Sequence, residues 1–60
     1  MFRLIAIVKR GTASNLPEVW VAYPTLEAAR AAAALLSRHE RVGRVMIVRA
    51  GVPPTFVQWA

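Results

Sequence analysis

The sequence predicts an α+β fold: a four-stranded, mainly antiparallel sheet with one helix packed on one of its faces. Only residues 25–41 show the apolar spacing of an amphipathic helix. Short runs rich in β-branched and aromatic residues, which are typical of strands, lie on both sides of it, at residues 2–9, 18–23, 44–49 and 55–59. The element order is therefore ββαββ, within a single domain of residues 1–60.

The first strand, residues 2–9, is apolar on both faces, because Ile5 and Ile7 alternate with other apolar side chains. A strand without a polar face is typical of the centre of a sheet. Residues 10–17 follow it and contain glycine, serine, asparagine and proline. This composition predicts a loop.

The second strand is predicted at residues 18–23, EVWVAY, and Pro24 ends it. In an extended conformation its two valines share a face with Tyr23, while Trp20 lies on the other face. We therefore expect Trp20 to lie on a face of the sheet.

The helix is predicted to begin at Thr25, because a threonine hydroxyl is a good N-cap, and Glu27 suits the positive end of the helix dipole. Steps of about 100° per residue place the apolar side chains on one face of the helix. They are Leu26, Ala29, Ala32, Ala33 and Leu36. Because this face is rich in alanine, we expect the helix to lie close to the sheet.

The third strand, residues 44–49, is again apolar on both faces, and a turn at residues 50–54 separates it from the last strand, residues 55–59. Adjacent prolines before the last strand favour an edge position, where a missing backbone donor costs least. Placing the two most apolar strands in the centre gives the strand order 2-1-3-4, antiparallel throughout.

One face of this sheet is expected to lack a cover, because a single helix covers only one face. An uncovered antiparallel face is normally polar, but here either choice of face leaves apolar side chains exposed. A contiguous apolar patch usually marks an interface, and a two-fold homodimer is its simplest form. We therefore expect a homodimer whose interface includes Ile5, Ile7 and Trp20.

The net charge of +5 arises from eight basic residues against three acidic ones. This balance favours anionic partners, although scattered arginines are also typical of an ordinary solvated surface. The alternative prediction is therefore a small nucleic-acid-binding accessory protein that contacts phosphates. Its candidate residues are Arg3, Lys9, Arg10, Arg44 and Arg49.

Patterns of catalytic, cofactor-binding or metal-binding residues do not occur in the sequence. The chain has no cysteine, which excludes disulfides and thiolate metal sites. His39 has no nucleophile and orienting carboxylate in a recognisable arrangement around it. No apolar run reaches the ~18 residues of a membrane span, and no signal-peptide pattern is present. We expect a cytoplasmic, non-enzymatic interaction module without a cofactor.

Overall fold

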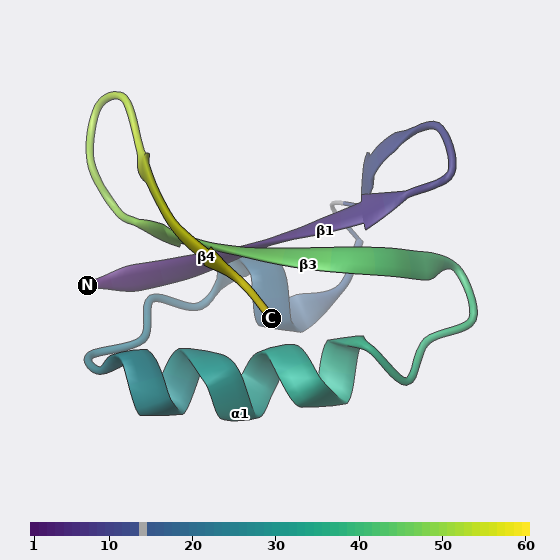
Figure 1. Cartoon of the computed structure of the whole chain (residues 1–60), viewed down its shortest axis with the longest axis horizontal. Coiled ribbons are helices and arrows are strands. Elements are labelled where there is room, and N and C mark those ends of the chain that lie inside the picture. The colour runs from purple at the N-terminus through teal and green to yellow at the C-terminus, as the bar shows by residue number, and fades with distance from the viewer. Residues whose placement is uncertain (14) are drawn as a thin grey trace.

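The structure, a computed structural model, describes residues 1–13 and 15–60. The sheet contains β1 (Phe2–Val8), β2 (Gly11–Ala13), β3 (Val42–Arg49) and β4 (Thr55–Trp59). A short 3-10 helix, η1 (Pro17–Trp20), and one α-helix, α1 (Leu26–Leu36), connect β2 to β3. Figure 1 shows α1 lying along one face of the sheet.

The strand order is β2-β1-β3-β4, and every neighbouring pair is antiparallel. This confirms the predicted fold class, the position of the helix on one face and the order 2-1-3-4. β1 and β3 are the two central strands, and Leu4 pairs with Ile47 and Ala6 with Val45. These four side chains are buried beneath α1.

The core lies between α1 and the two central strands. Its buried residues are Leu4, Ala6, Ala29, Ala33, Leu36, Val42, Val45 and Ile47. Ala29 and Ala33 are fully buried, so the helix backbone approaches the sheet closely, as expected. Thr25 caps the helix as predicted, because its hydroxyl accepts a hydrogen bond from the Ala28 amide at 3.1 Å.

The helix is shorter than predicted, since it ends at Leu36 and not at Arg41. The amides of Arg38 and His39 donate to the carbonyls three residues earlier, and the Val42 amide donates to the His39 carbonyl. Such bonds tighten the end of a helix into a turn. The chain must reverse here, because β3 already begins at Val42.

The prediction of a strand at residues 18–23 is wrong, because the structure forms η1 at Pro17–Trp20. β2 lies instead at Gly11–Ala13, inside the predicted loop, after a turn at Lys9 and Arg10. Gly11 has a φ of 118°, a backbone conformation that side chains resist. Pro17 suits the first position of η1, because its ring fixes a helical φ.

The pairing along the edges of β1 explains why the strand predicted at residues 18–23 is absent and why the predicted strand order is still correct. β3 occupies one edge of β1 along its whole length. Along the other edge, β2 pairs with Ala6, Ile7 and Val8, while Phe2 forms an isolated antiparallel bridge to Tyr23. The predicted strand thus pairs with β1 only at its last residue, and η1 forms in the segment between the two pairings.

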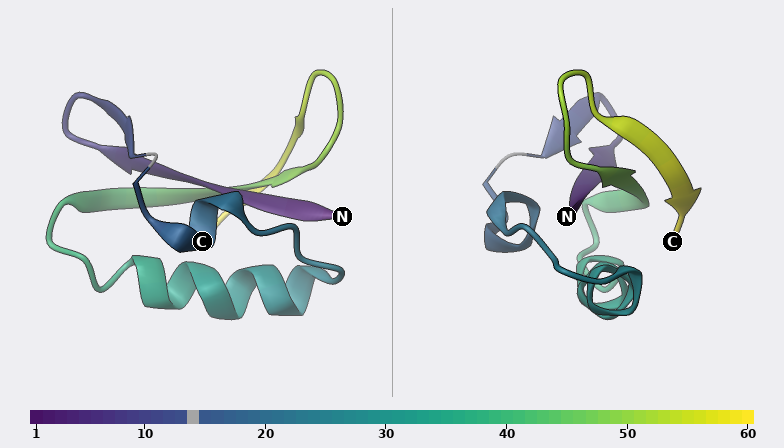
Figure 2. Two further views of the ribbon diagram at one scale, coloured as in Figure 1. Left: turned by 180° about the vertical axis from the view of Figure 1, so that it is seen from behind. Right: turned by 90° about the vertical axis from the view of Figure 1, so that its left-hand side faces the viewer.

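The η1 segment packs on the same side of the sheet as α1 (Figure 2), where Leu16 and Val19 contact the core. The Tyr23 hydroxyl donates a hydrogen bond of 2.9 Å to the Glu18 carbonyl. Burial, and then the charge of Glu18, raise the pKa of the Tyr23 hydroxyl above its ordinary value. Tyr23 therefore connects η1 to β1: its backbone bonds to Phe2 of β1, and its hydroxyl bonds to Glu18 of η1.

We predict that Ala33→Leu lowers the free energy of unfolding by about 1–3 kcal/mol, because a larger side chain overpacks the contact between α1 and the sheet. The matched control is Ala31→Leu, at an exposed position on the same helix, where the change is expected to stay within about 0.5 kcal/mol. Urea unfolding of both variants measures the difference. Equal effects at the two positions would show that the helix does not lie close to the sheet.

We predict that Tyr23→Phe costs about 1 kcal/mol of stability at neutral pH, because it removes the hydrogen bond to Glu18. A raised pKa means that the neutral hydroxyl is favoured in the folded chain. Its stabilisation is therefore complete below the unfolded pKa of about 10 and is lost as the pH rises through the raised folded pKa. The variant is expected to lose less stability than the native chain over that alkaline range.

Urea unfolding at neutral and alkaline pH measures this difference. Tyrosinate absorbance reports Tyr23 alone, because the chain has one tyrosine. If the difference in unfolding free energy between the native chain and Tyr23→Phe did not change with pH, the raised pKa of Tyr23 in the folded chain would be contradicted.

Candidate interaction surface

The register of the strands identifies the side chains on the face away from α1. Leu4 and Ile47 point into the core beneath the helix, so the neighbouring pair Ile5 and Met46 points the other way. The remaining apolar residues of this face follow from the same pairings. We call this surface the open face and define it by Ile5, Ile7, Met46, Val48, Phe56 and Trp59.

Phe56 and Trp59 share the open face because of an irregularity in β4. Phe56 pairs with Val48 and Trp59 with Met46, with a register shift between Ile47 and Val48. An extra residue of this kind, a β-bulge, changes which side chains share a face. The two rings lie 5.6 Å apart between centroids, tilted by 59°. In a strand without a bulge, Phe56 and Trp59 would lie on opposite faces.

Exposure differs across the open face. Phe56 is 50% exposed and Trp59 is 44% exposed, whereas Ile5, Ile7 and Met46 are half-buried and Val48 is buried. The turn between β1 and β2 and the loop between β3 and β4 both rise on the side away from α1 (Figures 1 and 2). The open face therefore lies between two raised hairpins.

Two arginines border the apolar side chains of the open face. Arg44 pairs with Ile7 and Arg3 with Val48, so both lie on this face. The Arg44 guanidinium carbon lies 4.9 Å from the centroid of the Trp59 ring. This is within the range of a cation–π contact, so the open face has a basic and aromatic side as well as an apolar centre.

The structure brings two of the three expected interface residues together. Ile5 and Ile7 both lie on the open face, as their alternation in β1 indicated. Trp20 belongs to η1 and not to a strand, and η1 lies on the α1 side of the sheet. It is 65% exposed there. Its role in an interface stays a prediction, at a site separate from Ile5 and Ile7.

The basic residues of the nucleic-acid alternative are divided among three places. Arg3 and Arg44 lie on the open face. Lys9 and Arg10 form the turn between β1 and β2. Arg49 lies on the opposite face, 5.9 Å above an aromatic ring of β1. The five residues therefore do not form one surface, and their contact with nucleic acid stays a prediction.

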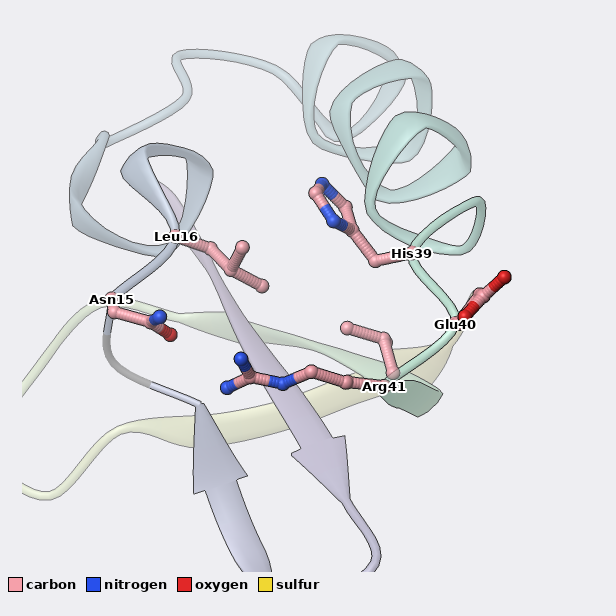
Figure 3. A pocket seen from close by; sticks show the side chains of 6 residues that line it. Asn15, Leu16, His39, Glu40 and Arg41 are labelled. Carbon is pink, nitrogen blue, oxygen red and sulfur yellow. The ribbon is translucent and has the colours of Figure 1, made fainter.

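A pocket of about 230 Å³ opens at the end of the sheet, between the segment that leads into η1 and the turn that leads into β3 (Figure 3). It is lined by Asn15, Leu16, His39, Glu40, Arg41 and Val42. No pattern in the sequence indicated this pocket. Its residues come from two segments far apart in the chain, and η1, which brings Leu16 to the core, was not predicted.

No group of three or more histidine, cysteine or carboxylate side chains suited to a metal ion occurs among residues 1–13 and 15–60. Within those same ranges, no helix has the length and hydropathy needed to cross a bilayer. Comparisons of the chain with protein-family models, with curated proteins and with solved structures gave no match.

We predict that Arg44 and Trp59 stabilise each other by about 0.5–1 kcal/mol, the range for an exposed cation–π contact. A double-mutant cycle with Arg44→Gln and Trp59→Leu measures this coupling from urea unfolding. A second cycle with Arg49→Gln and Phe2→Leu is the comparison. Its coupling is expected to be smaller, because the distance is 5.9 Å and phenylalanine binds cations less well than tryptophan. A coupling near zero for Arg44 and Trp59 would contradict the contact.

Proposed function

We propose that the chain is a non-catalytic interaction module that forms a homodimer through its open face. The observation that supports the proposal is the apolar surface on three neighbouring strands, on the side of the sheet away from the helix. Its members come from β1, β3 and β4, which are adjacent in the sheet. Apolar patches of this kind on small proteins usually bind another protein surface.

The size of the surface favours a second copy as the occupant. The accessible surface of the chain is 4314 Å², whereas a compact protein of 6.6 kDa is expected to expose about 3,900 Å². The sheet lies across the 26 Å and 19 Å axes of the molecule. This footprint is on the order of 500 Å² per copy, so two copies bury on the order of 1,000 Å², which is the lower limit for a specific interface.

A two-fold dimer uses the same patch on both copies, so an apolar face matches itself. The two raised hairpins restrict how the copies can meet, because a partner must lie between them. Sheets that cross at nearly a right angle satisfy this condition and occur in known sheet packings. We propose that arrangement for the dimer.

Charge predicts how salt acts on this dimer. The open face includes Arg3 and Arg44, whereas Glu18 lies on η1, Glu27 on α1 and Glu40 beside the pocket. Two copies therefore bring arginines together without compensating carboxylates. Because salt screens repulsion between exposed charges, dimerisation is expected to strengthen as salt concentration rises.

A second candidate function is binding of single-stranded nucleic acid to the same face. The contact between Arg44 and Trp59, beside Phe56, favours it, because aromatic rings and arginines form stacking platforms for bases. Such binding weakens as salt concentration rises, because counterions are released when phosphates are contacted. Salt therefore separates the two candidates by the sign of its effect.

We predict a native mass of about 13 kDa, twice the 6.6 kDa of the chain, by light scattering at low and high salt. Phe56→Gln is expected to shift the mass toward monomer, because it places an amide in the proposed interface. The matched control is Leu35→Gln on α1, since Leu35 is 54% exposed and Phe56 is 50% exposed. The control should leave the mass unchanged.

A monomer at every salt concentration would refute the dimer. If that monomer binds mixed DNA and RNA fragments at low salt only, and Phe56→Gln abolishes the binding, the second candidate replaces the first. Trp20→Ala tests the remaining expected interface residue. Release of monomer by Trp20→Ala, with no effect of Phe56→Gln, would place the interface on the α1 side of the molecule.

A further inference from the structure

A second surface lies at the end of the sheet where the turn between β1 and β2 meets the turn between α1 and β3. Two hollows adjoin there. The first is the pocket of about 230 Å³ shown in Figure 3. The second, of about 390 Å³, is lined by Val8, Lys9, Arg10, Glu40 and Arg41. Arg41 and Glu40 line both hollows, so one ligand can contact both.

The first hollow combines apolar and hydrogen-bonding side chains. Leu16 and Val42 supply apolar surface. Figure 3 shows the Arg41 side chain reaching across the pocket toward Asn15, with the His39 ring turned toward the same space. Ligand pockets for drug-sized molecules begin near ~300 Å³, so this smaller volume suits a single aromatic ring and not a larger group.

The second hollow is basic. Lys9, Arg10 and Arg41 line it together with Val8 and one carboxylate, that of Glu40, so its cations outnumber its carboxylate by three to one. Arginine and lysine side chains form strong charge-assisted hydrogen bonds with phosphate oxygens. The neighbouring cations therefore favour a phosphate group at this position.

We propose that this end of the molecule binds one nucleotide unit, with its base in the first hollow and its phosphate in the second. An imidazole ring can stack on a base, and a side-chain amide can donate to and accept from a base edge. Arg41 lies between the two subsites and contacts the phosphate. The unit is either a free mononucleotide or part of a single strand, since both present the same chemistry.

The nucleotide site and the proposed dimer use different residues. None of its lining residues belongs to the open face. Lys9 and Arg10 of the second hollow lie in the turn that borders that face, whereas the first hollow lies on the other side of this turn's strand, beside the segment that leads into η1. Scattered arginines on a basic chain commonly contact only solvent. What distinguishes Arg41 is its position beside an amide, an imidazole and two further cations, which together match a phosphorylated aromatic ligand.

The first experiment compares four probes: inorganic phosphate, thymidine, thymidine monophosphate and a short oligothymidine. Backbone amide shifts of the isotope-labelled chain report where each probe binds. Thymidine monophosphate is expected to shift the amides of Asn15, Leu16 and Arg41. It should bind about tenfold more tightly than phosphate or thymidine alone, because only it fills both hollows. Tight binding of the oligothymidine alone, with shifts at these same amides, identifies a strand as the source of the unit.

Two variants separate the subsites. Arg41→Gln should weaken binding of the nucleotide about tenfold, since it removes a charge-assisted contact. His39→Ala should abolish the preference for the nucleotide over phosphate and leave phosphate binding unchanged. The control is Arg30→Gln, an equal charge change at an exposed position on α1, which should alter binding by less than about twofold because salt screens distant charges.

Two results would overturn the proposal. Equal loss in Arg41→Gln and Arg30→Gln would mean that only the net charge attracts the probe. Equal affinity for phosphate and thymidine monophosphate would mean that the first hollow receives no base. In both cases the result leaves the dimer proposal untouched, because light scattering tests that proposal separately.

Discussion

The packing of one short helix against two central strands is the constraint on which the rest of the structure depends. α1 has 11 residues and is therefore about 16 Å long, whereas the molecule extends 26 Å. Ala29 and Ala33 let it lie close to β1 and β3, so the core is thin and lies on one side of the sheet. The opposite face of the sheet receives no cover from the helix.

The second constraint is the shared edge of β1. A three-residue β2 pairs with one end of that edge, and Tyr23 pairs with the other end. The chain between them leaves the sheet, forms η1 and places Leu16 and Val19 on the core. This segment places Asn15 and Leu16 opposite the turn that follows α1. The pocket therefore forms because the chain between the β2 pairing and the Tyr23 pairing lies outside the sheet.

Local patterns in the sequence were sufficient for the helix, the central strands and their order, because helical spacing and doubly apolar strands reflect burial directly. They failed where a tertiary contact overrides local preference. Residues 18–23 alternate like a strand, yet β2 pairs with Ala6, Ile7 and Val8 on the edge that they would use. Gly11 and Ala13 have low strand preference, so no pattern indicated β2. The bulge that joins Phe56 to Trp59 depends on pairing with β3, which alternation alone does not reveal.

The apolar and basic surfaces of the chain therefore have separate structural origins. The open face exists because one helix leaves half of the sheet uncovered. The basic end exists because two turns, at Lys9 and Arg10 and at Arg41, meet at the same end of β1 and β3. Association through the open face is expected to strengthen as salt screens its arginines, whereas phosphate contacts weaken steeply as salt is added. The two surfaces consist of different residues, so the proposed assembly and the proposed anion binding can be tested with separate variants.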